Sequence, residues 1–501
     1  MNLKLMLGEA ARQYRDKTAI AFGESRLSYA QLDEESNRVA NALMDIGVSK
    51  GDRVAMLLPN NLEFVTIYFG IVKIGAIAVP LDTKYKPTEL TALFADCQPK
   101  LLVIESSLLP PIIPLLPGWP SVAQVVETGT GDRSEFLDYE ALIAAGSAAP
   151  PDGAISPEDT AHISYTSGPT LQPRGVVLSH GSLVAEVRIS AEGFQQTDKD
   201  KVALFALPLH HVFGLVVILF TSLYKGSTVV ILSGLSINNL MELIEREKVT
   251  MFLGVPFIHA MVINWVEHEG IKYDLASLRL CGSAGAVLPI DIAQKYNSAL
   301  GMDIVDFWGQ TESSGHVTCT AIGDVLKPGC VGRALPGWEL KVLDDKGQEL
   351  PPGQSGEIAV RGPIMTGYYC QPEATARAIK NGWLYTGDLG MVDENGDLFL
   401  TGINKDMINA KGQNIYPSDI EEVLRSYPGV AEVAVVGVPD KARGQIIKAV
   451  IQLQDGQVAE ELVLRRLCLD CLANYKVPKQ FVFVDSMPRT AVGDISKGAL
   501  R

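Results

Sequence analysis

Apolar strand-like segments alternate with amphipathic helical segments from the start of the chain, and this alternation limits the possible folds more than any other feature. Residues 29–44 place apolar side chains at helical spacing behind Ser28, a suitable N-cap, and residues 53–58 have the pattern of a buried strand. A second helix is predicted over residues 61–73 and a second strand over residues 76–80. Strand, helix and strand in this order are typical of a parallel sheet covered on both faces, so the predicted fold class is α/β.

The length and spacing of the predicted strands change beyond about residue 330. Upstream, further strands are predicted over residues 101–105, 228–232, 251–254 and 278–282. Downstream, shorter strands broken by Gly and Pro indicate a β-rich subdomain, with strands over residues 338–343, 356–361 and 398–401. After Gly402 helices and strands mix again, which predicts a small α+β unit with elements over residues 417–426, 430–438, 446–453 and 459–472.

Charge and cysteine content exclude several classes of protein. The formal net charge of −15 argues against nucleic acid as a partner, because such affinity comes from Lys and Arg neutralising phosphates. The seven cysteines are an odd number without a framework spacing, which favours a reducing, cytoplasmic setting. Cys468 and Cys471 form an isolated CxxC pair with no second pair to complete a metal site, so we interpret them as core residues.

One apolar stretch is long enough to test as a membrane span. Residues 202–224 contain no Asp, Glu, Lys or Arg, but Pro208, His210 and His211 interrupt their middle. A spanning helix with two imidazoles and a proline at its centre is improbable. We therefore predict buried core beside a functional site and no integral membrane segment.

The sharpest local motif is the segment Tyr165-Thr-Ser-Gly-Pro-Thr-Leu-Gln-Pro-Arg-Gly-Val176, which follows an apolar run and precedes a helical one. Small and hydroxylated residues between a strand and a helix let backbone N–H groups converge on an anion, as in phosphate-binding loops. The Walker pattern is absent, because no Gly-Lys-Ser/Thr is present. By itself the motif leaves a surface turn as the alternative.

Together with this loop, further motifs in the same order resemble those of the adenylate-forming superfamily, which contains acyl-CoA synthetases, peptide-synthetase adenylation domains and luciferases. They are Leu207-Pro-Leu-His-His-Val-Phe-Gly214, Gly282-Ser-Ala-Gly-Ala-Val-Leu-Pro289, Trp308-Gly-Gln-Thr-Glu312, Tyr385-Thr-Gly-Asp388, Gly402-Ile-Asn-Lys-Asp406, Gly412-Gln-Asn-Ile-Tyr-Pro417 and Tyr475-Lys-Val-Pro478. The overall look is closest to the acyl-CoA synthetases.

The resemblance implies an architecture and a two-step reaction. Residues 1–402 are expected to form a large N-terminal domain of two sheet-and-helix subdomains plus a small β-barrel, and residues 403–501 a small mobile α+β domain. In the family, a carboxylate attacks the α-phosphate of ATP to give an acyl-adenylate and pyrophosphate, and a thiol then displaces AMP. The implied cofactors are ATP, Mg²⁺ and coenzyme A, and the implied substrate is a small-molecule carboxylic acid.

Roles are carried over only to positions that match the family motifs. Glu312 resembles the Mg²⁺ carboxylate, Asp388 the ribose-binding acid, and His211 the gate between the acid pocket and the thiol tunnel. The catalytic set implied in this way is Thr170, Arg174, His211, Glu312 and Asp494. The implied nucleotide-binding set is Thr166, Ser167, Gly168, Gly285, Ala286, Trp308, Gly309, Thr311, Asp388 and Lys405.

The other ligands have implied positions too. Coenzyme A would approach Lys411, Gly412 and Gln413, where a glycine permits close contact with the backbone. The acid pocket would be lined by Val212, Phe213, Val255, Phe257 and Gly282. This lining is mostly apolar, which favours a fatty or aryl acid over an amino acid.

The sequence departs from the family pattern where the family contacts phosphate. Pro169 and Leu171 replace Thr and Gly in the loop, Arg174 replaces Lys, and Ile403 replaces an Arg. Asp494 stands where the family has the Lys that bridges carboxylate and α-phosphate. One unit-charge pair at ~4 Å is worth roughly 4 kcal/mol at an effective dielectric constant of ~20, which corresponds to about a thousandfold in rate. Lys497 is a candidate to replace the missing cation.

Two hypotheses follow from this pattern. The first is a carboxylic acid–CoA ligase whose ATP half-reaction is impaired, since Glu312 and Asp388 are retained. The second is a non-catalytic or repurposed homologue that binds acyl-CoA or a nucleotide without turnover. ATP–pyrophosphate exchange would discriminate between them. The sequence does not determine the identity of the acid or the oligomeric state.

Overall fold

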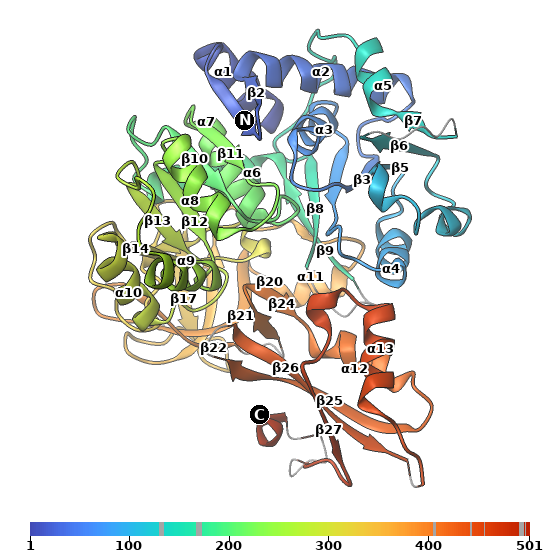
Figure 1. Cartoon of the computed structure of the whole chain (residues 1–501), viewed down its shortest axis with the longest axis vertical. Helices are drawn as coiled ribbons and strands as arrows, with labels where there is room; N and C mark the ends of the chain where they lie inside the picture. The colour runs from blue at the N-terminus through green and yellow to red at the C-terminus, as the bar shows by residue number, and fades with distance from the viewer. Residues whose placement is uncertain are drawn as a thin grey trace. The chain divides into compact units, whose positions relative to one another are not determined.

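A computed structural model describes residues 1–129, 135–166, 173–403, 407–440, 443–454, 456–489, 495 and 497–501. Its contacts divide the chain into two compact units. The first unit comprises residues 1–83, 97–164 and 175–404, and the second comprises residues 84–96, 165–174 and 405–501. Each unit is described separately below, and Figure 1 labels the elements of both.

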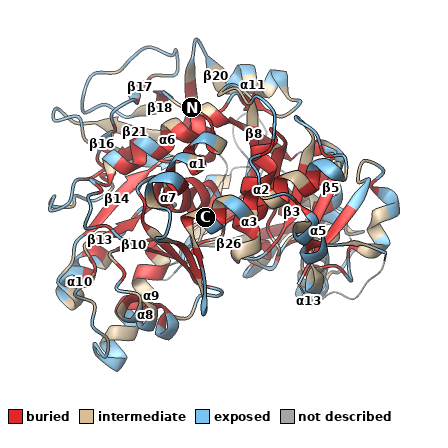
Figure 2. Ribbon diagram, turned by 90° about the horizontal axis from the view of Figure 1, so that it is seen from above, coloured by how far each residue is buried: buried red, intermediate tan, exposed pale blue. Residues whose placement is uncertain are grey.

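A nine-stranded sheet forms one half of the first unit. Its strand order is β16-β15-β14-β13-β12-β10-β11-β1-β2, and the pairs from β14 to β1 are parallel. The strands are β1 (Thr18–Phe22), β2 (Ser25–Ser28), β10 (Val202–Phe205), β11 (Thr228–Ile231), β12 (Met251–Gly254), β13 (Leu280–Ser283), β14 (Ile304–Trp308), β15 (Thr318–Cys319) and β16 (Arg333–Ala334). Figure 2 shows β10, β13 and β14 buried, while α8 (Ile237–Arg246) and α10 (Ile290–Leu300) present exposed faces.

An eight-stranded sheet forms the other half of the first unit. Its order is β19-β9-β8-β4-β3-β5-β6-β7, and β3 lies parallel to both β4 and β5. The strands are β3 (Arg53–Leu57), β4 (Ile77–Pro80), β5 (Leu101–Glu105), β6 (Gln124–Thr128), β7 (Leu137–Asp138), β8 (Thr160–Thr166), β9 (Arg174–Ser179) and β19 (Gly367–Tyr368). These two parallel sheets confirm the predicted α/β class with two sheet-and-helix subdomains.

The helices of the first unit begin where the sequence places capping residues. Ser28 and Gln31 form a reciprocal capping box at the start of α2 (Tyr29–Asp45), and Asn61 caps α3 (Leu62–Lys73). The remaining helices of this unit are α1 (Leu3–Tyr14), α5 (Tyr139–Ala145), α6 (His180–Gly193), α7 (Thr221–Tyr224), α9 (Pro256–Glu269) and α11 (Pro372–Ala378). The predicted helices over residues 29–44 and 61–73 are therefore confirmed to within a residue at each end.

The apolar stretch 202–224 lies in the core. It forms β10, a loop through Pro208 and His211, and then a π-helical segment, η3 (Phe213–Phe220), whose residues are all buried. Phe220 packs against Phe69 and Tyr68 of α3, with 5.3 Å between ring centroids in each pair. Across the described ranges, no helix combines the length and apolarity needed to cross a bilayer.

A third, five-stranded antiparallel sheet completes the first unit and corresponds to the predicted small barrel. It contains β17 (Glu339–Leu343), β18 (Gly356–Arg361), β20 (Ile379–Lys380), β21 (Trp383–Val392) and β22 (Leu398–Ile403). A turn joins β21 and β22, and there the Asp393 side chain accepts hydrogen bonds from the N–H groups of Asn395 and Asp397. This sheet places Asp388 on its central strand, β21.

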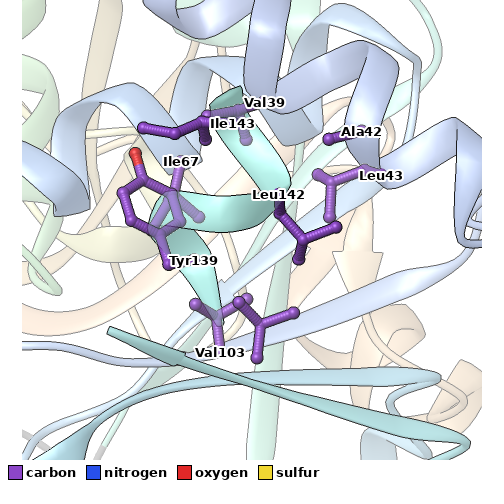
Figure 3. A pocket seen from close by; sticks show the side chains of 9 residues that line it. Val39, Ala42, Leu43, Ile67, Val103, Tyr139, Leu142 and Ile143 are labelled. Atoms are coloured by element: carbon purple, nitrogen blue, oxygen red, sulfur yellow. The ribbon is translucent and has the colours of Figure 1, made fainter. Parts of the chain in front are cut away.

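A small apolar cavity is lined by residues of α2, α3, α5, β5 and β6, whose side chains Figure 3 shows. Its volume is about 20 Å³, room for about one water molecule, but its wall carries no polar surface. The lining residues are Val39, Ala42, Leu43, Ile67, Val103, Val126, Tyr139, Leu142 and Ile143. We interpret it as a packing defect of the first unit.

The second unit is a small α+β fold. Its sheet has the order β24-β23-β26-β25, with β27 parallel to β26. The strands are β23 (Ile408–Ala410), β24 (Gln413–Ile415), β25 (Val430–Asp440), β26 (Gly444–Leu453) and β27 (Gln480–Val484). The helices are α4 (Pro87–Cys97), α12 (Pro417–Arg425) and α13 (Glu461–Cys471). Cys468 is fully buried in the core of this unit, as the core interpretation expects, whereas Cys471 is only half-buried at its edge; both are free thiols.

Candidate active site

The loop after β14 carries the best-defined group of candidate residues. Trp308 ends β14, a parallel strand, and Thr311, Glu312 and Ser313 form a short 3-10 turn directly after it. Ligands in open α/β sheets bind at the carboxyl ends of the strands. The candidate nucleotide residues Trp308, Gly309 and Thr311 therefore lie where this architecture favours a binding site.

Asp388 is the acceptor that joins this loop to the third sheet. Its Oδ2 accepts the indole N–H of Trp308 at 3.0 Å and the amide N–H of Gln310 at 2.7 Å. Asp388 and Trp308 are both buried, at 8% and 7% exposure. Hydrogen bonds to a charged acceptor are stronger than neutral ones, and burial strengthens them further. The structure thus brings together two predicted nucleotide residues that are separated by 80 positions.

Glu312, the predicted metal carboxylate, is held by a different partner. The Tyr368 hydroxyl donates to its Oε1 at 2.9 Å, and its own backbone carbonyl accepts the N–H of Met365 at 2.8 Å. Tyr368 lies on β19, which pairs with β9 through the partners Tyr368 and Val176. The strand that follows the predicted phosphate loop is therefore linked, through β19, to the predicted metal carboxylate.

The chemistry of Glu312 fits a nucleotide-bound Mg²⁺. Magnesium in such sites takes one or two protein carboxylates and fills its other positions with phosphate oxygens and water. Within the described ranges, no group of three or more His, Cys, Asp or Glu is placed to hold a metal. Glu312 would hold the ion together with the phosphates of ATP, and Asp388 would accept hydrogen bonds from the ribose hydroxyls.

His211, the predicted gate, lies in the loop between β10 and η3. Its Nδ1 accepts the backbone N–H of Phe213 at 3.2 Å, so the neutral ring carries its proton on Nε2. Loss of solvation in the surrounding protein lowers the pKa of His211. Neighbouring His210 lowers that pKa further, whereas the charge of Glu312 raises it. His211 is neutral at pH 7 and near the predicted metal carboxylate.

The predicted acid-pocket residues, which we call the acid wall, are Val212, Phe213, Val255, Phe257 and Gly282. Phe257 is half-buried and the other four are buried. Gly282 on β13 has little free space, because a Cβ there would lie 2.5 Å from Leu253 and 3.2 Å from the ring of Phe307. The rings of Phe307 and Phe213 meet edge to face at 5.2 Å.

A buried imidazole supports the acid wall from behind. His259 on α9 has no exposed surface, and its Nε2 is 2.9 Å from the carbonyl oxygen of Gly282. Burial lowers the pKa of His259 to about 4, so the neutral ring donates from Nε2 to that oxygen. The rings of Phe252 and Tyr296 pack against it edge to face.

Other predicted ligand positions have clear local structures. Gly285 and Ala286 belong to the predicted nucleotide-binding set; Gly285 is exposed with a φ of 80°, and Ala286 is half-buried. In the second unit, Lys411 and Gly412 form the two-residue turn between β23 and β24, with φ values of 56° and 79°. Gln413 begins β24. The predicted coenzyme A residues thus share one hairpin tip.

Several predicted positions lie outside the described residues. They are Ser167, Gly168, Pro169, Thr170, Leu171, Lys405 and Asp494, and the side chains of Thr166 and Ile403 join them. Arg174 is described, and it is the half-buried first residue of β9. The roles given to all these positions remain predictions.

Three contributors to the site were missed in the sequence. Gln310 lies inside the quoted motif that begins at Trp308, and Tyr368 lies on β19, but nothing local shows that one reaches Asp388 and the other reaches Glu312. Phe307 precedes the Trp308 motif directly, and its contact with Gly282 depends on β13 and β14 being neighbours. Only strand order could have revealed these pairs.

Two parallel sheets, a smaller antiparallel sheet and a carboxylate-bearing loop at the end of β14 define an adenylate-forming enzyme. Residues 7–369 match the family model of the AMP-binding enzymes, and residues 419–494 match that of the AMP-binding enzyme C-terminal domain. The chain belongs to the AMP-binding enzyme family, and it is an enzyme of the acid–thiol ligase class.

Similar proteins act on both aliphatic and aromatic acids. The chain is 32% identical to a long-chain-fatty-acid–CoA ligase of Bacillus subtilis, over 99% of this chain and 94% of that protein. It is 35% identical to a feruloyl-CoA synthase of Amycolatopsis, over 98% and 96% of the two chains. Among solved structures, an amide bond synthetase of Marinactinospora thermotolerans superposes with a TM-score of 0.91 at 30% identity, covering 100% of this chain and 99% of that one.

Proposed function

We propose that this enzyme joins a fatty or aryl carboxylic acid to coenzyme A through an acyl-adenylate, and that its ATP half-reaction is slow. The acid oxygen bonds to the α-phosphorus of ATP as pyrophosphate leaves. The thiol of coenzyme A then bonds to the acyl carbon as AMP leaves. ATP, Mg²⁺ and coenzyme A are the proposed cofactors.

The observation that carries this proposal is the paired network around Asp388 and Glu312. Asp388 accepts from Trp308 and Gln310, and Glu312 accepts from Tyr368, so both carboxylates are held in place before any ligand arrives. Fixed donors and acceptors need no reorganisation during the reaction. Random loss of function would be expected to disturb the Asp388 and Glu312 hydrogen bonds as well as the phosphate contacts.

The acid wall supports an apolar substrate. Phe213, Val255 and Gly282 are buried, and the ring of Phe307 adds to the same surface. An amino acid would need a carboxylate for its amino group, and residues 209–213 offer none. The relatives' substrates, a long-chain fatty acid and a feruloyl group, keep both aliphatic and aryl acids within the proposal.

The proposed weakness of the ATP half-reaction rests on charge. Asp494 and Ile403 each stand where the family has a cation, and Pro169 removes an N–H donor from the phosphate loop. Lys497, the candidate replacement, is ion-paired with Glu421 at 2.9 Å. Lys497 would have to break this ion pair before it could contact the phosphate, so it is a poor substitute for the missing lysine.

Measuring the two half-reactions separately tests the proposal. We expect weak ATP–pyrophosphate exchange, roughly a thousandfold below ordinary rates, with fatty or aryl acids. Thioester formation from a supplied acyl-adenylate and coenzyme A should proceed at ordinary enzyme rates. Failure of the second step with every acid would favour the non-catalytic alternative, and full-rate exchange would disprove the impaired step.

A charge reversal sharpens this test. Asp494→Lys should raise pyrophosphate exchange and leave thioester formation from supplied acyl-adenylate unchanged, because only the first step is expected to use this group. Asp485→Lys, a reversal elsewhere in the second unit, is the matched control and should change neither rate. A different result would contradict this account: the wild type already exchanges pyrophosphate at a full rate, and Asp494→Lys loses that rate. The carboxylate of Asp494 would then take part in the reaction itself.

An amine acceptor is a second candidate for the last step. The observation that favours it is the close superposition on an amide bond synthetase over the whole chain. With acyl-adenylate supplied, coenzyme A and a panel of amines can compete in one reaction. Amide formation exceeding thioester formation would replace the thiol with an amine in the proposal.

A further inference from the structure

The loop that carries Glu312 folds back on itself in a tight turn. The N–H of Val317 donates to the carbonyl of Trp308 at 2.9 Å, which closes the loop at its base. Ser314 and Gly315 have φ values of 60° and 144°, in the region that favours glycine. Gly309 lies directly against this turn, because a Cβ at Gly309 would be 1.6 Å from the carbonyl oxygen of Gly315. The orientation of the loop therefore depends on how the turn at 314–316 is held.

A buried glutamate on a different element holds that turn. Glu186 lies on α6 with no exposed surface, and its Oε1 accepts the backbone N–H of His316 at 2.8 Å. The same oxygen accepts the hydroxyl of Ser190 at 2.9 Å, and that hydroxyl is 3.2 Å from Nδ1 of His316. One carboxyl group and one hydroxyl thus contact both the backbone and the ring of His316.

The surroundings of Glu186 are apolar apart from these partners. Val217 of η3 and the ring of Phe194 line the turn and the His316 ring, and the Trp338 indole N–H is the other polar group facing the carboxyl. His316 is the titratable neighbour, and burial lowers its pKa to about 3, so it is neutral. Burial raises the pKa of Glu186 to about 8, and the carboxyl group is therefore mostly protonated at pH 7.

Packing alone does not account for an acid at this position. A buried carboxyl group is costly unless hydrogen bonds compensate, and an apolar residue would fill the same volume at lower cost. The compensating bonds of Glu186 are made to the turn that follows Glu312. The group therefore connects a core helix to the loop of the candidate site.

We propose that Glu186 is a positioning residue, which fixes the 314–316 turn through the His316 backbone and so sets the orientation of Glu312 toward Mg²⁺. The role assigned to Glu312 rests on the proposed function, whereas the anchoring of the loop does not. The two parts are tested by separate measurements.

Hydrogen exchange of the ligand-free protein, read by mass spectrometry on peptides covering residues 309–317, tests the anchoring. Glu186→Gln keeps an acceptor of the same shape and should exchange within about twofold of wild type. Glu186→Ala should exchange at least about tenfold faster in this loop, since one hydrogen bond to a buried N–H is lost. Glu127→Ala is the matched control: Glu127 is a buried glutamate on β6, and its removal should leave the loop unchanged.

Calorimetry of ATP binding with and without Mg²⁺ tests the second part. The gain in ATP affinity on adding Mg²⁺ should be kept in Glu186→Gln and should fall at least about tenfold in Glu186→Ala, while Mg²⁺-free affinity stays within about threefold. An unchanged loop in folded Glu186→Ala would overturn the proposal. Faster loop exchange with an unchanged Mg²⁺ gain would overturn the link to the metal, and a wild type without any Mg²⁺ gain would overturn the metal role of Glu312. If Glu186→Ala does not fold, Glu186→Asp, whose shorter side chain withdraws from His316, gives the same outcomes.

Discussion

The Asp388 network joins the end of β14 to the third sheet, and the acid wall includes Gly282 on β13, the strand next to β14; different forces hold the two regions. Trp308 and Gln310 donate to Asp388, so the network at the end of β14 consists of buried, charge-assisted hydrogen bonds. The acid wall beside it, at Gly282 of β13, is apolar packing with one neutral imidazole behind it.

Because of this difference, the two regions should tolerate different kinds of substitution. A buried hydrogen-bond network loses much when one member is removed, because its partners stay buried and unpaired. An apolar wall instead responds to changes in volume. Changes in the network should therefore affect nucleotide binding, whereas changes in the wall should affect the choice of acid.

Asp388→Ala should have the largest effect. It leaves the Trp308 and Gln310 donors without their acceptor and removes the proposed ribose contact. We expect AMP affinity to fall by about 100-fold or more, because hydrogen bonds to a charged group contribute about 1.5–3 kcal/mol each. Calorimetry with AMP measures this change. Asp397→Ala removes a carboxylate that lies in the turn between β21 and β22 and pairs with Lys327 and Arg333, and it should leave AMP affinity unaltered; equal losses in both variants would contradict the assignment.

Gly282→Val should affect the binding of the acid and leave AMP binding unchanged, the opposite of Asp388→Ala. Its branched side chain would collide with Leu253 and Phe307, and overpacking of this kind costs about 1–3 kcal/mol. We expect a lower melting temperature and an acid KM raised by about tenfold, with AMP affinity unchanged. Gly234→Val, at an exposed position with open space around it and without a positive φ, controls for the loss of glycine itself. A parallel loss of AMP affinity would show that wall and network are one structural unit.

Lowering the pH should weaken the wall through His259. Its pKa is about 4 in the folded chain and ordinarily 6.5, so the unfolded state binds the proton more readily. The stabilisation is complete above pH 6.5 and is lost as the pH falls toward 4. Between pH 7 and pH 5 the group should account for roughly 2 kcal/mol of lost stability. Urea unfolding at both pH values measures it, and His259→Gln, which can donate to Gly282 without titrating, should lose correspondingly less.

Val103→Ile should have the smallest effect and should leave both regions alone. Val103 lines the small cavity bounded by α2, α3, α5, β5 and β6, and one extra methylene would fit the space of about 20 Å³ (Figure 3). We expect a gain of about 0.5–1 kcal/mol in the free energy of unfolding, seen as a higher melting temperature. AMP affinity and acid KM should match wild type. Destabilisation would mean that the cavity cannot accept the added group.

Local signals in the sequence predicted most of the fold. Ser28 is the N-cap of α2 as expected. Its side chain accepts the backbone N–H of Gln31, only three residues further on, so the signal is local. The strand over residues 101–105 appears with the predicted bounds, since an uninterrupted apolar run is typical of a strand buried on both faces. Ends were less well predicted where tertiary pairing extends a strand, as when β22 continues to Ile403 opposite Asp388.

The sequence by itself determined the α/β class, the family motifs and the candidate roles of Glu312 and Asp388, because each depends on short-range patterns or on residues read in order. Only the tertiary structure decided which side chains meet. Gln310 reaches Asp388 across 78 positions, and Glu186 reaches His316 across 130. Such partners carry no local signature, since a hydrogen bond depends on distance and direction in space. The order of the strands sets both.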